Sequence, residues 1–127
     1  MEKEIVLSKD IMIVSEADEK GIILYANDDF CKIAGFSRDE LIGRPHNIVR
    51  HKDMPKLAFE DMWQTIKNGK IWKGIVKNKT KDGDYYWVNA TAYPSKTSKG
   101  MHRYISVRVK PTLEEIQNAQ KFYLTLK

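Results

Sequence analysis

The stretch "WKGIVKNKTKDGDYYWVNATAYP", residues 72–94, holds the strongest strand pattern in the chain. Two runs rich in β-branched and aromatic residues flank "KDG", and the pair Asp82-Gly83 is typical of a tight hairpin turn. Residues 101–109, "MHRYISVRV", follow a polar loop and read as a further strand. The sequence therefore predicts three consecutive antiparallel strands.

Both faces of the middle predicted strand carry large apolar side chains. One face holds Tyr86, Val88, Ala90 and Ala92, and the other holds Tyr85, Trp87, Asn89 and Tyr93. In the strand that follows, Ile105, Val107 and Val109 alternate with Tyr104, Ser106 and Arg108. Because one face of a sheet covers the core, we expect the other face to meet a terminal segment or a second subunit.

The N-terminal half predicts a hairpin followed by short helices. Residues 11–15 and 21–26 read as strands that turn around Asp18–Gly21. Asn27 is placed to cap a short helix that Gly35 ends, and the capping box "SRDE", residues 37–40, opens a second helix over Arg38–Ile42.

A longer helix follows, with Asp53 as the expected N-cap, Pro55 in the first turn and Asn68-Gly69 at its end. Its buried stripe consists of Phe59, Met62, Trp63 and Ile66. A capping box from Thr112 to Glu115 opens a C-terminal amphipathic helix.

These elements predict an α+β fold: a five-stranded antiparallel sheet with short helices and one longer helix on one face, plus the C-terminal helix. The helices must cross one face of the sheet, which leaves a natural pocket beneath them. We divide the chain into an N-terminal segment (1–10), one domain (11–110) and a C-terminal helix or linker (111–127).

Composition restricts the classes of function. The 127 residues carry a dispersed net charge of +5, which does not favour nucleic-acid binding. A single cysteine, Cys31, fits a reducing compartment, and neither a signal peptide nor an apolar run long enough to span a bilayer is visible. We therefore expect a cytoplasmic domain that does not insert into a membrane, although its parent or partner can be attached to the inner membrane.

The polar run "PHNIVRHKDMP", residues 45–55, stands between two helical segments. From the residues alone it reads as a surface loop, a metal site, a catalytic site or a wall that holds an anionic ligand. The spacing of His46 and His51 is unspecific for metal, and no metal is expected. No catalytic set or nucleotide-binding motif is present, so we do not expect an enzyme.

Residues 10–110 resemble the flavin-binding PAS domain of the Aer aerotaxis receptors. The resemblance rests on the order of elements and on four motifs: "PHNIVRHKDMP", followed by "FEDMW", "IWKGIVKNKTKDGDYYWV" and "YISVRV". The resemblance implies a redox or oxygen sensor that binds FAD non-covalently and relays flavin redox state to a chemotaxis signalling module, in cis or in a separate transducer. By motif it assigns to the FAD site Arg50, His51, Asp53 and Trp72. It also places at the cavity Asn27, Phe59, Asn78, Tyr86 and Tyr104.

Several alternatives stay open at this point. A cofactor-free PAS module would dimerise or dock through the outer face of the sheet or the terminal helix. A haem-binding PAS gas sensor would use His46 or His51 as the axial ligand. A small flavoenzyme lacks an evident substrate pocket, and Cys31 lies on the first helix rather than where photoadduct-forming domains place their cysteine.

Overall fold

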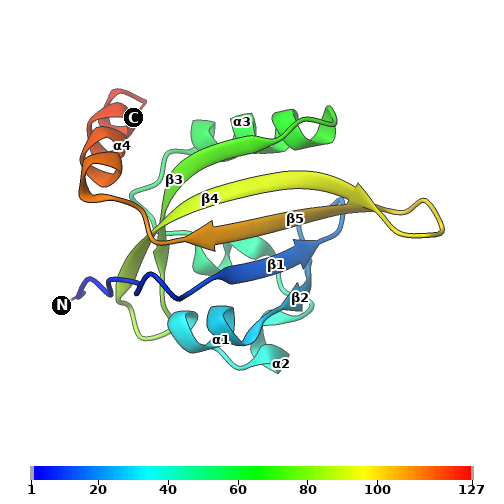
Figure 1. Cartoon of the computed structure of the whole chain (residues 1–127), viewed down its shortest axis with the longest axis horizontal. Coiled ribbons are helices and arrows are strands. Elements are labelled where there is room, and N and C mark those ends of the chain that lie inside the picture. The colour runs from blue at the N-terminus through cyan, green and yellow to red at the C-terminus, as the bar shows by residue number, and fades with distance from the viewer. Residues whose placement is uncertain (1, 127) are drawn as a thin grey trace.

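The computed structural model describes residues 2–126 and contains the five-stranded antiparallel sheet that the sequence predicts (Figure 1). The elements are β1 (Ile13–Ala17), β2 (Ile23–Ala26), α1 (Asp28–Ala34), α2 (Arg38–Leu41), the 3-10 helix η1 (His46–Val49), α3 (Lys56–Lys67), β3 (Trp72–Lys79), β4 (Tyr85–Lys96), β5 (His102–Val109) and α4 (Leu113–Thr125). The strand order is β2-β1-β5-β4-β3, so the helices between β2 and β3 connect the two edges of the sheet. The predicted α+β fold class is confirmed.

Local capping chemistry sets the starts of α1, α2 and α4 as predicted. The Asn27 side chain accepts a hydrogen bond from the Phe30 amide, and Ser37 and Thr112 each form a complete capping box. Each cap satisfies amides that the first turn of a helix leaves without partners. In the β3–β4 hairpin, Gly83 adopts a φ of 91°, a left-handed conformation that glycine tolerates without strain.

The expected N-cap role of Asp53 is wrong. Helix α3 begins at Lys56, with Pro55 in the cap position and no side-chain cap. A residue that precedes proline is pushed towards extended backbone, so the helix cannot begin before Pro55. The Asp53 carboxylate instead accepts a hydrogen bond from Lys77 Nζ on β3, at 2.9 Å.

Terminal segments cover the outer face of the sheet, as expected. Trp87 on that face is only 6% exposed. The Ile5 amide donates to the Tyr85 carbonyl at 2.7 Å, and the Tyr123 hydroxyl of α4 donates to the Ile75 carbonyl of β3. Figure 1 shows the N-terminal segment and α4 at the same end of the sheet.

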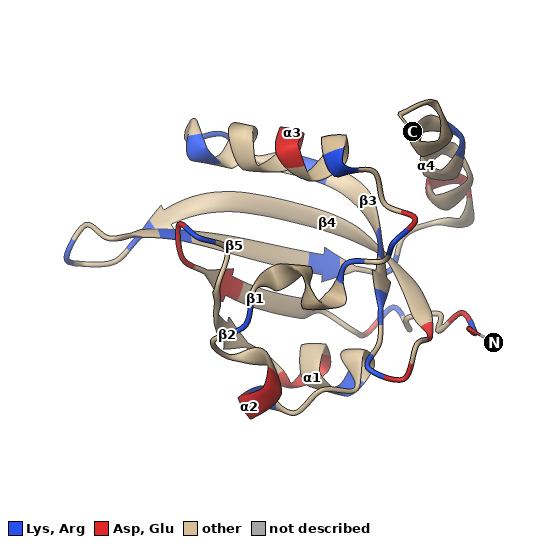
Figure 2. Ribbon diagram, turned by 180° about the vertical axis from the view of Figure 1, so that it is seen from behind, with Lys and Arg blue, Asp and Glu red and all other residues tan. Residues whose placement is uncertain are grey.

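Charge is dispersed over the chain. Figure 2 shows Lys and Arg interspersed with Asp and Glu on helices, strands and loops. Within the described residues, no helix has both the length and the apolar character needed to cross a membrane.

Candidate ligand-binding site

A cavity lies between the sheet and the helices because strand β4 carries small side chains there. Ala90 and Ala92 of β4 form its floor. The flanking strands and α3 supply its walls, with Trp72, Val76 and Asn78 from β3, Tyr104, Ser106 and Arg108 from β5, and Phe59, Met62, Trp63 and Ile66 from α3. The predicted pocket beneath the helices is therefore present, and its lining is mostly apolar.

The cavity is small in this conformation, at about 80 Å³. Pockets that bind drug-sized molecules are larger, about 300–1,000 Å³. Trp63 of α3 closes one end by packing edge-on against Tyr104, with 5.3 Å between ring centroids. A ring-sized ligand therefore requires this cavity to enlarge.

Unpartnered hydrogen-bond donors surround the cavity. Within residues 2–126, three cavity residues have a buried side-chain nitrogen without a partner: Arg50 Nε, Asn78 Nδ2 and Arg108 Nε. The Tyr86 hydroxyl lies close to Asn78, but the geometry falls short of a hydrogen bond. A buried polar group without a partner costs about 1–3 kcal/mol. All three nitrogens are donors, so a ligand that satisfies them must present acceptor atoms.

Arg108 is the most unusual of these residues, because it is 2% exposed and forms no ion pair with any described residue. Its Nη2 donates to Ser15 Oγ at 2.7 Å, and its guanidinium lies 4.4 Å from the centre of the Phe30 ring. Burial lowers the pKa of Arg108 to about 10, which still leaves it charged at neutral pH. The cavity therefore contains a cation without a counter-ion among the described residues.

His46 is connected to Arg108 through the same hydroxyl. Its Nε2 lies 3.0 Å from Ser15 Oγ, and its ring stacks on Phe30. Ser15 accepts from Arg108, so we assign its own proton to the hydrogen bond with Nε2. His46 also lines the cavity. Burial, reinforced by Arg108 and Arg50, lowers the pKa of His46 to about 3.

This arrangement predicts a pH dependence of the ligand-free domain. Between pH 6.5 and about 3 the unfolded His46 is protonated and the folded His46 is neutral, so the free energy of unfolding falls as the pH drops. Replacing His46 by Gln removes this contribution. In urea unfolding, we expect the wild type to lose about 1–2 kcal/mol more than His46→Gln between pH 7 and pH 5. Parallel pH profiles of the two proteins would contradict the assignment of a neutral His46.

Arg50 occupies the border between the cavity and the surface. Its guanidinium lies 3.9 Å from the centre of the Phe59 ring, and burial lowers its pKa. Arg50 and Phe59 also line a second, open groove along α3, whose charged residues include Lys56, Glu60 and Lys67. Arg50, Phe59 and Trp63 line both hollows, so these three side chains form the boundary between the cavity and the groove.

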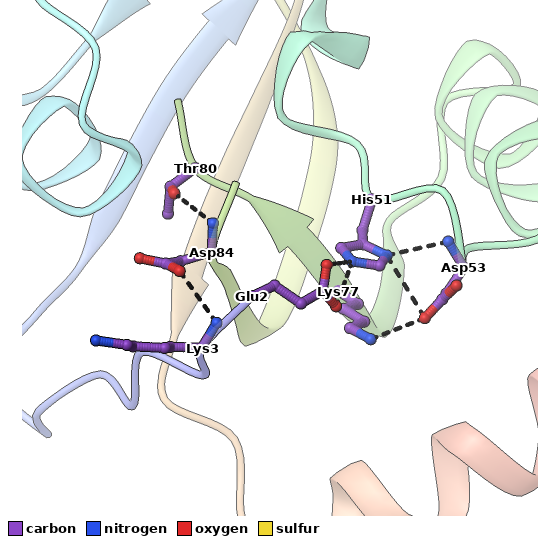
Figure 3. Close-up of polar contacts among 7 residues, drawn as sticks. All are labelled: Glu2, Lys3, His51, Asp53, Lys77, Thr80 and Asp84. Carbon is purple, nitrogen blue, oxygen red and sulfur yellow. Dashed lines mark hydrogen bonds and ion pairs between the residues drawn. The ribbon is translucent and has the colours of Figure 1, made fainter. Parts of the chain in front are cut away.

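The structure brings together five of the nine site residues expected from the sequence. The residues that line the cavity are Arg50, Phe59, Trp72, Asn78 and Tyr104. Tyr86 is fully buried beside Asn78 but outside the lining. The side chain of Asn27 binds Met12, Val14 and Phe30 of its own hairpin and helix. His51 and Asp53 lie with the N-terminal segment and β3 (Figure 3).

The sequence patterns did not single out Ser15 or Arg108, and they suggested His46 only as a metal or haem ligand. The alternation of side chains along β5 could have identified Arg108 as a cavity residue. Tyr104 was expected at the cavity, and Arg108 lies four residues further along the same strand, so it shares the same face.

Metal and haem fit these residues poorly. No three His, Cys, Asp or Glu side chains gather as metal ligands in the part of the chain that the structure describes. An axial haem ligand needs a free imidazole nitrogen that faces the cavity. His46 Nε2 is engaged by Ser15, and His51 points away from the cavity.

Trp72 connects the cavity with α3 and the edge of the sheet. Its indole Nε1 donates to Asp61 of α3 at 2.9 Å. The ring lies across Gly74, where a Cβ atom would stand 2.6 Å from Trp72 Cζ2 and 3.0 Å from Cζ3. Glycine at position 74 therefore provides the space that the indole occupies.

We expect Gly74→Ala to displace the indole and to lower the free energy of unfolding by about 1–3 kcal/mol, as overpacking usually does. Urea unfolding followed by tryptophan fluorescence measures this loss. In the double variant Trp72→Phe/Gly74→Ala the outer indole atoms are absent, so the two effects should be less than additive. Strict additivity would show that a methyl group at position 74 does not meet the indole of Trp72.

Comparisons with known proteins agree with this geometry. The family model described as "PAS fold" matches residues 23–108. The chain is 46% identical over 120 residues to the aerotaxis receptor of Escherichia coli (strain K12), covering 94% of this chain and 24% of the relative. It is 28% identical over 107 residues to the nitrogen fixation regulatory protein of Klebsiella oxytoca, covering 80% of this chain and 22% of that protein.

Solved structures show the same fold. A light-oxygen-voltage domain studied with a flavin analogue superimposes with a TM-score of 0.72 at 19% identity, covering 91% of this chain and 87% of that one. The light-state LOV domain of Aureochrome1 gives 0.69 at 20% identity, with 93% and 91% covered. The chain therefore belongs to the PAS family. Within that family it is most similar, among the relatives described above, to the PAS region of an aerotaxis receptor, and it spans about a quarter of the length of the curated relatives.

Proposed function

We propose that this chain is a redox- or oxygen-sensing PAS domain that binds FAD non-covalently and relays the redox state of the flavin to a chemotaxis signalling module. The observation that carries the proposal is the set of unpartnered donors on Arg50, Asn78 and Arg108 around one apolar cavity. The similarity to a protein named aerotaxis receptor supports the same conclusion.

The unpartnered donors and the apolar lining of the cavity, once it is enlarged, suit a flavin ring. Isoalloxazine is flat and aromatic, and its carbonyl oxygens and ring nitrogens are acceptors. The alanine floor and the aromatic side chains of α3 and β5 would pack on its faces. When bound, the flavin supplies reversible electron transfer, and its reduction adds negative charge or a proton to the ring. Arg108 and Asn78 would meet that charge with donors that are already buried at the cavity wall.

The groove outside α3 favours a dinucleotide over a single ring. Arg50 lies where the cavity meets the groove, and a guanidinium binds phosphate through paired, charge-assisted hydrogen bonds. Lys56 and Lys67, at the two ends of α3, add positive charge along the groove, and Glu60 is the acidic residue that lies between them. The diphosphate of FAD would therefore lie near Arg50, with the remainder of the molecule along the groove.

The outer elements of the sheet provide a route for the signal. Trp72 lines the cavity, donates a hydrogen bond to Asp61 and lies across Gly74. The next residue, Ile75, accepts a hydrogen bond from the Tyr123 hydroxyl of α4. A change at the cavity wall would therefore alter the support of α4. The receiving module is a chemoreceptor signalling region, either in the same polypeptide or in a separate transducer.

A ligand series tests the proposal. Ligand-free protein is titrated with FAD, FMN, riboflavin and haemin, and bound flavin is then reduced and reoxidised. We expect FAD to bind about 100-fold or more tightly than riboflavin, because of these two ligands only FAD reaches Arg50 and the groove. We also expect a reversible redox cycle without sustained turnover of NADH. Preference for haemin, steady NADH oxidation or the absence of flavin binding would each overturn it.

A cofactor-free docking module is the second candidate function. Helix α4 exposes Leu113, Phe122 and Leu124, at 70%, 58% and 70%. Such residues favour dimerisation through the terminal helix. Sedimentation of the flavin-free protein tests it: a dimer that Phe122→Ser dissociates supports this role, and a monomer at high concentration argues against it.

A further inference from the structure

His51 points away from the cavity because Arg50 points into it. The Arg50 backbone is extended, with φ −75° and ψ 124°, and it bridges to Asn78 on the free edge of β3. The next amide, that of His51, donates to the Lys77 carbonyl at 3.4 Å. Successive side chains of an extended chain point to opposite sides. When Arg50 lines the cavity, His51 must therefore face the outer side of the sheet.

On that outer side the His51 ring is buried, with 3% of the residue exposed. Its Nδ1 accepts a hydrogen bond from the Asp53 amide at 3.0 Å, so we assign the ring proton to Nε2. Nε2 donates to the carboxylate of Glu2, at 3.2 and 3.3 Å from its two oxygens. Figure 3 shows the ring between Asp53 and Glu2.

The N-terminal segment, residues 2–7, is docked at this place by its backbone. The Lys3 amide donates to Asp84 Oδ1 at 3.0 Å, and the Tyr85 amide donates to the Lys3 carbonyl at 3.0 Å (Figure 3 draws the first of these bonds). The Ile5 amide then donates to the Tyr85 carbonyl at 2.7 Å, and Leu7 is buried in the core. The segment thus pairs in parallel with the start of β4.

Charged side chains surround His51 and contact one another. Lys77 Nζ donates to the Asp53 carboxylate at 2.9 Å and lies 4.4 Å from the centre of the Tyr85 ring. The His51 ring meets the same Tyr85 ring edge-on, at 6.0 Å. Glu2 and Asp53 are therefore the acidic groups that face His51, and Lys77 is the basic one.

We propose that His51 is a positioning residue, which ties the N-terminal segment to the loop that aims Arg50 into the cavity. His51 holds Glu2 with one nitrogen and the turn at Asp53 with the other, so docking of the segment and placement of Arg50 depend on each other. For a ligand bound at Arg50, which rests on the proposed function, this dependence is reciprocal: ligand binding strengthens docking of the segment, and docking strengthens ligand binding.

The first test needs no flavin and follows hydrogen exchange at the Ile5 and His51 amides. His51→Asn keeps an acceptor near the Nδ1 position, whereas His51→Gln keeps a donor near the Nε2 position. We expect His51→Asn to speed exchange at Ile5 by about tenfold, and His51→Gln to stay near the wild type. Exchange at Ile5 that is unchanged by His51→Asn would overturn the proposal.

Two substitutions at exposed glutamates test the same contact without changing a buried side chain, so they should not prevent folding. Glu2→Ala removes the partner of His51, and Glu4→Ala removes an exposed carboxylate two residues further along the same segment. We expect Glu2→Ala to speed exchange at both amides several-fold, because it removes a hydrogen bond to a charged carboxylate. Glu4→Ala should leave exchange at both amides unchanged. Equal effects of the two variants would overturn the role of Glu2 and His51.

The second test separates positioning from general loss of structure. Glu2→Ala should weaken FAD binding in the wild-type background and have no further effect in Arg50→Ala, because it acts through Arg50. Equal weakening in both backgrounds would overturn the proposal. If the wild type binds no FAD, the proposed function fails, while the exchange experiments still decide whether His51 docks the segment.

Discussion

Replacing Arg108 by Met is expected to stabilise the ligand-free domain and to weaken its binding of FAD. Arg108 is a buried cation without an acidic partner among the described residues, so the folded protein bears the cost of removing its charge from water. Methionine fills similar volume without charge. We expect the free energy of unfolding to rise by about 1–2 kcal/mol in urea titrations of the flavin-free protein.

The loss of affinity has the same origin. A ligand with acceptor atoms at this wall recovers the cost of the buried charge, and the methionine variant offers it no donor. Equilibrium titration should show a dissociation constant for FAD that is about 10–100-fold higher. A site that holds strain for function commonly gives this opposition between stability and binding.

Arg103→Met is the matched control, because Arg103 lies on the same strand but pairs with Glu16 at 3.4 Å outside the cavity. It should change neither quantity by much. An Arg108→Met protein that is strongly destabilised, or that binds FAD as the wild type does, would contradict the role given to Arg108.

The second large effect is the loss of FAD affinity that we expect for Arg50→Ala. The variant should bind FAD about 100-fold more weakly, because charge-assisted contacts to the diphosphate are lost. Riboflavin lacks the phosphates, so its affinity should remain near that of the wild type. Arg50 is only half-buried, and we expect a small change in the stability of the flavin-free protein. Fluorescence titrations with both ligands at one fixed salt concentration measure the difference.

Arg44→Ala removes an exposed arginine that precedes η1 and should leave both affinities unchanged. Arg50→Lys retains the charge but not the planar fork, and it should fall between the wild type and Arg50→Ala. Equal losses of FAD and riboflavin in Arg50→Ala would show that Arg50 supports the cavity rather than the diphosphate.

The fold could be predicted because its signals are local. Alternation marked the strands, and the capping boxes at Ser37 and Thr112 marked two helix starts. The error at Asp53 arose because two local rules compete there. Asp53 is a good cap by residue type, but Pro55 moves the helix start beyond its reach.

The candidate site was predictable only in part, because its assembly depends on long-range register. Arg108 and His46 meet through Ser15, which stands opposite Ser106 in the β1–β5 pairing. The register of two strands that are far apart in the sequence cannot be read from the residues of either strand alone. The resemblance placed Arg50 and His51 together in one site, whereas the extended backbone between them sends the two side chains to opposite sides of β3.

An absorption spectrum of the freshly purified protein, with the ligand then released by heat and identified, tests the central claim most directly. The account predicts the absorption bands of oxidised flavin and the release of one FAD per chain. A colourless protein that takes up no added FAD, or a spectrum with the Soret band of haem, would contradict it.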